Sequence, residues 1–238
     1  MSRGVVIPTD QFFAGQSRYA RFAAGRPSYG KAYLPQGKIA SETKTAFAKA
    51  NAAWPMADSK YDGAMLRQIV LVSGAPGSGK STLAAPLAKE LGATLISKDD
   101  IKETLWDVLH APSQDLAWSR TLGAAAMEVL WRLAAQCPFA VLDAPFRPQS
   151  TIEQDHIASL DARVIEVHCS CSPSEAIRRY NGRADQRHPT HVLRVLTPEH
   201  LAEFDGALHL GPRIDINTEG STDIPHLAQR IRQLLRGV

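Results

Sequence analysis

The chain has 238 residues, of which 44% are hydrophobic, and a formal net charge of +3. This length and apolar content fit one α/β domain with an extension, and so mild a charge does not by itself indicate nucleic-acid binding. The sequence lacks an apolar run of the roughly 18 residues that a membrane-spanning helix needs, so no membrane span is expected.

The first part of the chain, residues 1–64, differs in composition from the rest. It carries nine Lys or Arg against four Asp or Glu, and nine of the sixteen aromatic residues. Residues 41–53 fit a helix with Ser41 as N-cap, and no secretory or transit pattern is evident. Three interpretations stay open: an arm wrapped over the following domain, a disordered or vestigial leader with a start at Met65, or a basic substrate-binding appendage. We predict an N-terminal extension over 1–64 and a second domain over 65–238.

A glycine-rich loop follows the first predicted strand, residues 69–72. The loop fits G-x-x-x-x-G-K-[ST], the phosphate-binding P-loop, and runs directly into a helix. Its predicted nucleotide-binding residues are Gly74, Ala75, Pro76, Gly77, Ser78, Gly79, Lys80, Ser81 and Thr82.

The residue types of this loop suit phosphate chemistry. Glycines let backbone N–H groups close around phosphate oxygens, and the helix directs its positive dipole end at the same anion. Lys80 adds a point charge for the β- and γ-phosphates, and the Ser81 hydroxyl suits Mg²⁺. The loop therefore predicts binding of a nucleoside triphosphate with magnesium.

Helices and strands alternate along the rest of the chain. Predicted helices cover 82–91, 100–110, 113–136, 148–160, 173–180 and 223–235, with a short helix opened by Thr197-Pro198. The remaining predicted strands cover 93–97, 139–142, 163–169 and 213–217. This alternation predicts an α/β fold of three layers, the P-loop NTPase fold, with a five-stranded parallel sheet covered on both faces.

Three local features refine these helices. Pro86 lies inside the first helix, where the missing N–H predicts a kink or an early break. Ser172 and Glu175 have the spacing of a capping box at the start of helix 173–180. Residues 181–194 are basic and irregular, which indicates a loop.

Two carboxylates are expected near the P-loop, because ligands of parallel sheets bind at the carboxyl ends of the strands. Asp99 follows the second strand, and a carboxylate there can take the proton from an attacking hydroxyl. The alternative is that Asp99 only caps the next helix, with Asp100 as a first-turn acid. Asp143 ends the third strand, where it would orient Mg²⁺, line the acceptor pocket or form a structural turn.

Arginines recur through the end of helix 173–180 and the loop after it. They are Arg178, Arg179, Arg183 and Arg187. Arginines on a mobile loop can stabilise the charge of a transferring phosphoryl group, although a basic run can also be a solvated surface.

Two histidines and three cysteines carry side chains suited to metal or redox chemistry. His188 and His191 lack a nearby third metal ligand, so we expect substrate or lid contacts at most. The cysteines are Cys137, Cys169 and Cys171, and the last two point in parallel on one predicted strand. This favours buried thiols over a disulfide or a metal site, and hence a reducing cytoplasm.

Four stretches together resemble a known group of kinases. They are GAPGSGKST, ISKDDIKETL, VLDAPF and CSPSEAIRRYNGR. They resemble the P-loop kinases of the AAA_33 and zeta-toxin kind, which include chloramphenicol phosphotransferase-like enzymes and the kinase domain of polynucleotide kinases. The resemblance covers about residues 66–238.

The resemblance implies roles for residues outside the P-loop. Asp99 matches the aspartate that activates the acceptor, and Arg179 and Arg183 match the lid arginines. Asn217 and Thr218 match a region near the adenine. ATP and Mg²⁺ are the implied cofactors.

The predicted activity is transfer of the γ-phosphoryl group of ATP to a hydroxyl of a small-molecule acceptor, such as an antibiotic or a metabolite. The alternatives are a polynucleotide 5′-hydroxyl kinase, a zeta-toxin-like sugar-nucleotide kinase and a non-catalytic nucleotide-dependent switch. Nucleic acid is therefore the second expected partner, no membrane partner is expected, and the sequence predicts neither the acceptor nor the oligomeric state.

Overall fold

A computed structural model describes residues 66–109, 115–192, 195–204 and 206–237. The predicted extension, its helix over 41–53 and the predicted domain boundary lie outside these residues. The described elements are β1 (Arg67–Ser73), α2 (Lys80–Leu91), β2 (Thr94–Ser97), α3 (Lys98–Leu109), α4 (Leu116–Ala134), β3 (Phe139–Asp143), α5 (Thr151–Ser159), β4 (Ala162–Ser170), α6 (Pro173–Asn181), a 3₁₀ turn (Ala184–Gln186), α7 (Pro198–Ala202), β5 (Arg213–Asn217) and α8 (Ile224–Arg236).

The five strands form one parallel sheet in the order β2-β3-β1-β4-β5. Val70 in the central strand pairs with Val141 on one side and Ile165 on the other. All three are buried, as expected for strands that are covered on both faces. The predicted five-stranded parallel sheet is confirmed.

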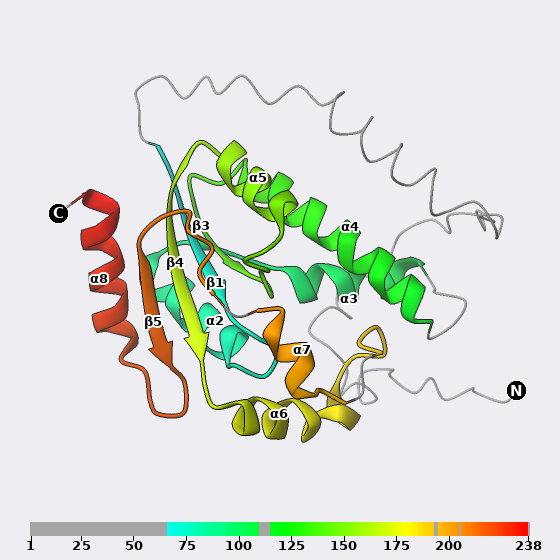
Figure 1. The fold of residues 1–238 in the computed structure, drawn as a ribbon. Coiled ribbons are helices and arrows are strands. Elements are labelled where there is room, and N and C mark those ends of the chain that lie inside the picture. Colours follow the sequence, from blue (N-terminus) through cyan, green and yellow to red (C-terminus); the bar gives the residue numbers. More distant parts are fainter. Residues whose placement is uncertain (1–65, 110–114, 193–194, 205, 238) are drawn as a thin grey trace, which may run out of the picture. The chain divides into compact units, whose positions relative to one another are not determined.

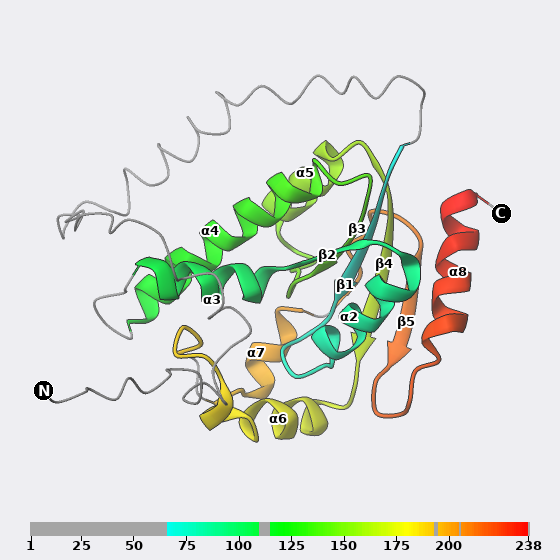
Figure 2. The ribbon, with the colours of Figure 1, turned by 180° about the vertical axis from the view of Figure 1, so that it is seen from behind.

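Helices cover both faces of the sheet (Figures 1 and 2). Val70 and Val72 face a core shared with α2 and α8, whereas Ile69 and Leu71 face a second core shared with α4 and α5. This alternation follows from the two-residue period of a strand. The three-layer α/β fold is therefore confirmed, with α6 and α7 beyond the carboxyl ends of the strands (Figure 1).

The expected early break at Pro86 is wrong, because α2 continues from Lys80 to Leu91. Because Pro86 has no backbone N–H, the carbonyl of Thr82, one turn earlier, lacks its helical hydrogen bond. Both residues are exposed. That carbonyl therefore lies on the solvent side of the helix, where water can satisfy it.

The capping box predicted at the start of α6 is also wrong. Ser172 is the N-cap, but its side chain makes no capping hydrogen bond. The Glu175 carboxylate instead accepts hydrogen bonds from Arg178 and Arg179. In the described part of the chain, none of the helices combines the length and the apolarity needed to span a membrane.

Candidate functional site

The P-loop joins β1 to α2 and lies against the start of α6. Gly77 has a φ of 82°, and a Cβ there would lie 2.2 Å from the carbonyl oxygen of Ala176. Gly74 has a φ of 129°, and a Cβ there would lie 2.2 Å from the carbonyl oxygen of Cys169. Both positions therefore require glycine for the backbone conformation and for the close approach of β4 and α6.

Lys80 is the first residue of α2 and is buried. Its Nζ donates a hydrogen bond to the carbonyl oxygen of Ala75 over 2.8 Å, so the ammonium group lies within the curve of the loop. Burial lowers the pKa of Lys80, and the charges of Asp143 and Asp99 oppose this effect. The lysine and the two carboxylates thus share one electrostatic environment.

Asp143 ends β3 and accepts a hydrogen bond from the Ser81 side chain. Burial raises the pKa of Asp143, while the bond from Ser81 and the charge of Lys80 lower it. Among the described residues, no group of three or more His, Cys, Asp or Glu could hold a metal by itself. A single carboxylate beside a hydroxyl does fit Mg²⁺, which takes its remaining ligands from phosphates and water.

Asp99 lies in the first turn of α3, which begins at Lys98. The reading of Asp99 as only an N-cap is wrong, because the Asp100 N–H donates to the Ser97 hydroxyl. Ser97 pairs with Asp143 across β2 and β3, so Asp99 and Asp143 are at the same edge of the sheet.

The Asp99 carboxylate is charged and accessible. Half of its side chain is exposed (50%), and Lys98 Nζ lies 2.9 Å from Oδ1. Partial burial alone would raise the pKa of Asp99, but the charges of Lys98, His191 and Lys80 bring it below its ordinary value. The group is therefore ionised at neutral pH and has an exposed surface that an acceptor hydroxyl can reach.

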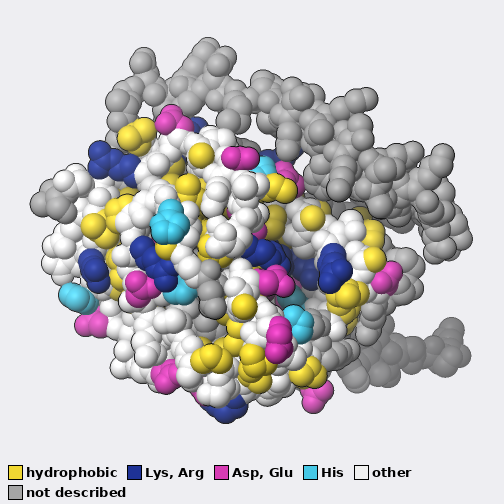
Figure 3. Space-filling view, viewed as in Figure 1, with side chains coloured by type: hydrophobic (Ala, Val, Ile, Leu, Met, Phe, Trp, Pro, Cys, Tyr) yellow, Lys and Arg dark blue, Asp and Glu magenta, His cyan; other side chains and the backbone are white. Residues whose placement is uncertain are grey.

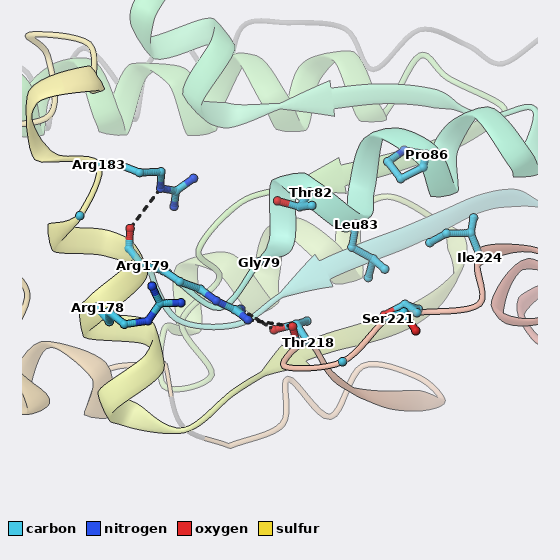
Figure 4. Close-up of a pocket in the computed structure, with 14 residues that line it drawn as sticks. Gly79, Thr82, Leu83, Pro86, Arg178, Arg179, Arg183, Thr218, Ser221 and Ile224 are labelled. Carbon is cyan, nitrogen blue, oxygen red and sulfur yellow. Dashed lines mark hydrogen bonds between the residues drawn. The ribbon is translucent and has the colours of Figure 1, made fainter.

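The arginines of α6 and the following loop have different partners. Arg179 donates to Glu175 and, from its two terminal nitrogens, to the hydroxyl and the carbonyl oxygen of Thr218 (Figure 4). Arg183 is exposed, and its Nε donates to the Arg179 carbonyl oxygen over 3.2 Å. The helix ends at Asn181, so these two arginines are not on one continuous helix face.

A cavity of about 640 Å³ lies between α2, α6 and the loop that joins β5 to α8 (Figure 4). This volume lies within the range of small-ligand sites, roughly 300–1,000 Å³. Its lining includes Gly77, Gly79, Thr82, Leu83, Pro86, Arg179, Arg183, Thr218, Ser221 and Ile224. The cavity therefore opens directly onto the P-loop.

The structure separates the two residues predicted near adenine. Thr218 lines the cavity, and its hydroxyl lies 2.8 Å from the Ser78 carbonyl oxygen. Asn217 is absent from the lining, and its Oδ1 instead accepts from the Glu219 N–H. Ile224 and Pro86 were missed as pocket residues, because no sequence motif marks an apolar wall.

Charged side chains also meet outside the cavity. Figure 3 shows basic and acidic groups side by side in the hollow at the centre of the molecular face. Asp99 and Asp143 do not line the cavity. The cavity and the two carboxylates thus both adjoin the P-loop but do not share a lining.

Comparison with known proteins gave one family model and several solved structures. The AAA_33 model, described as an AAA domain, matches residues 69–201. A search of curated proteins found no match. A provisionally assigned kinase from Chloroflexus aurantiacus has 26% identity and a TM-score of 0.63, covering 71% of this chain and 99% of that chain.

Two other solved structures are more distant. The APS kinase of Mycobacterium tuberculosis in complex with AMPPNP and APS has 18% identity and a TM-score of 0.47, covering 73% of this chain and 99% of that chain. Shikimate kinase from Acinetobacter baumannii in complex with shikimate has 15% identity and a TM-score of 0.44, covering 72% and 94%.

Proposed function

The chain belongs to the AAA_33 family of AAA domains, and we propose that it is an ATP-dependent phosphotransferase that acts on a hydroxyl of a small molecule. The observation that carries this proposal is the ionised, half-exposed Asp99 at the same sheet edge as the P-loop. A protein that only binds nucleotide has no need of a charged proton acceptor there. The likeness to the Chloroflexus aurantiacus protein, itself described as a kinase, supports the same reaction class.

The P-loop and the cavity provide the nucleotide site. The backbone N–H groups of residues 74–79 and the first turn of α2 receive the phosphates, and Lys80 compensates their charge. The base and ribose occupy the cavity between Thr218 and α2. Arg179 holds the Thr218 wall in place through its two hydrogen bonds.

Ser81 and Asp143 would hold Mg²⁺. The hydrogen bond between them and the buried position of Asp143 both favour this assignment. When bound, the ion neutralises charge on the β- and γ-phosphates. Of the three roles that the sequence left open, these contacts support a metal-directed role for Asp143 over the acceptor pocket and the structural turn.

The transfer step uses Asp99 as the general base. The acceptor hydroxyl gives its proton to the Asp99 carboxylate while its oxygen attacks the γ-phosphorus. The bond from the γ-phosphorus to the β,γ-bridging oxygen breaks, and ADP leaves. Arg183, exposed at the rim of the cavity, supplies positive charge to the transferring group when the loop closes.

The charge of the domain favours a small acceptor over a nucleic acid. Residues 65–238 carry 18 Lys or Arg against 20 Asp or Glu, and this slight negative charge disfavours a polyanionic acceptor. The three cysteines are free thiols, which supports the cytoplasmic location expected from the sequence.

The experiment is an acceptor screen with γ-labelled ATP and Mg²⁺. Purified protein is offered phenicols, aminoglycosides, nucleosides, sugars and oligonucleotides, and labelled product is separated from free phosphate. Asp99→Asn should lower transfer by about 100-fold or more while ATP affinity stays within about twofold. Asp100→Asn, one residue along and exposed, is the matched control.

Three results bear on the proposal. Transfer to a small hydroxyl compound that depends on Asp99 supports it. Phosphoryl transfer by Asp99→Asn at the wild-type rate would show that Asp99 is not the general base. Labelling of the oligonucleotide alone, with affinity that falls steeply as salt rises, would favour the polynucleotide kinase instead.

A further inference from the structure

Residues 187–191 join the nucleotide side of the molecule to α3 and α4. The segment follows the 3₁₀ turn after α6. Although the sequence predicts an irregular loop, side chains of three helices contact it. These contacts serve neither the P-loop nor the cavity directly.

Thr190 is the buried anchor of the segment, with 0% of its surface exposed. Its carbonyl oxygen accepts hydrogen bonds from Ser119 Oγ over 2.6 Å and from Lys102 Nζ over 3.2 Å. Lys102 Nζ also donates to Ser119 Oγ over 2.8 Å, and both side chains are buried. A buried lysine that donates to a loop carbonyl oxygen indicates a positioning role.

The two histidines on either side of Thr190 pair with a row of acids on α3. Asp99, Glu103 and Asp107 are four residues apart, so they share one helix face. His191 Nε2 lies 2.9 Å from Glu103 Oε1, and His188 Nε2 lies 3.0 Å from Asp107 Oδ1. His191 thereby lies close enough to Asp99 to lower its pKa.

The other end of the segment contacts α6. The Arg187 guanidinium carbon lies 3.8 Å from the centre of the Tyr180 ring. Tyr180 directly follows Arg179, which holds the wall of the cavity. The segment therefore touches the helix that faces the nucleotide and the helix that carries the proposed base.

We propose that residues 187–191 form a strap that couples nucleotide binding at α6 to the position of α3, with Lys102 as its buried positioning residue. The proposal rests on the proposed nucleotide site. A ligand that orders α6 through Arg179 and Arg183 also orders Tyr180 and Arg187, and the histidine pairs pass this restraint to α3. Coupling of this kind requires contacts at both ends, which the structure provides.

The test is amide hydrogen exchange of the full chain, with and without AMPPNP and Mg²⁺. In the wild-type protein, AMPPNP should slow exchange in α2, α6 and α3, the last by about fivefold or more. In His188→Gln/His191→Gln, α2 and α6 should keep their protection and α3 should lose it.

Controls separate this effect from general loss of stability. His156→Gln cuts a similar pair with Glu128, 3.2 Å apart, far along the chain from the strap, and should keep the protection of α3. Glu103→Gln/Asp107→Asn removes the same two pairs from the side of α3. It should also lose the protection of α3, and it replaces the histidine variant if that variant does not fold.

The outcomes distinguish the strap from the nucleotide site. Protection of α2 and α6 without α3 in the wild type, or undiminished protection of α3 in both double variants, overturns the strap alone. No protection anywhere overturns the nucleotide site and the strap with it.

Discussion

Arg179 binds Thr218 through two hydrogen bonds. Its Nη1 donates to the Thr218 hydroxyl over 3.0 Å, and its Nη2 donates to the Thr218 carbonyl oxygen over 2.9 Å. The Thr218 hydroxyl also lies 2.8 Å from the Ser78 carbonyl oxygen. One threonine therefore links α6, the P-loop and the end of β5. This junction forms a wall of the cavity. The family resemblance implied roles for Arg179 and Thr218 but not the contact between them.

Thr218→Val keeps the shape of this side chain but removes the three hydrogen bonds of its hydroxyl, with Arg179, Ser78 and Ser170. We expect nucleotide affinity to fall by about tenfold, since hydrogen bonds to a charged group contribute roughly 1.5–3 kcal/mol. Calorimetric titration with AMPPNP measures the effect. Thr121→Val on α4, which removes only a local bond to Ala117, should leave the affinity unchanged.

Gly77→Ala should destabilise the protein by about 2 kcal/mol or more, because the backbone has a left-handed φ and the new Cβ meets the Ala176 carbonyl. Urea unfolding measures the loss. Gly220→Ala is the matched control in the same cavity, since its Cβ would meet nothing within 4 Å. Equal stability of the two variants would contradict the close approach of the P-loop and α6.

Asp143→Asn tests the magnesium assignment. It should raise the Mg²⁺ concentration needed for half-maximal nucleotide binding on the order of tenfold, because a neutral amide replaces a metal-directed carboxylate. Affinity measured without Mg²⁺ should change little. Asp155→Asn, at an exposed position of α5, provides the control. A rise confined to the acceptor KM would instead assign Asp143 to the acceptor pocket.

Lys102 predicts a pH dependence of stability. Burial lowers its pKa from 10.5 to about 8. Between these values the folded protein has lost the proton while the unfolded chain retains it, so stability rises with pH across this interval. Across this interval Lys102 should raise the free energy of unfolding by about 3 kcal/mol, since one pKa unit corresponds to about 1.4 kcal/mol.

Lys102→Met should therefore lack this rise. Its free energy of unfolding, compared with the wild type from pH 7.5 to 10.5, gives the contribution of Lys102 by difference. Lys89→Met, which removes an exposed lysine from α2, should keep the wild-type slope. A Lys102→Met slope equal to the wild-type slope would show that this ammonium group is not buried.

The elements of the fold were predictable where the signal is local. The apolar run at residues 69–72, the glycines of the P-loop and the 3.6-residue period of α2 each depend on neighbours in the sequence. The capping-box prediction for α6 failed because a local spacing pattern competed with stronger side-chain interactions. Glu175 had the spacing to cap α6, but two arginine side chains offered it charged hydrogen bonds instead.

The sequence by itself determined the family, the parallel α/β fold and the position of the P-loop between the first strand and its helix, because torsional freedom, side-chain period and motif spacing are properties of adjacent residues. Only the tertiary structure decided which side chains meet. Arg179 donates a hydrogen bond to Thr218, which is 39 residues further along the chain. Lys102 donates one to Thr190, which is 88 residues further along. Such pairings depend on the path of the chain and on which groups are buried together, and neither is encoded in local spacing.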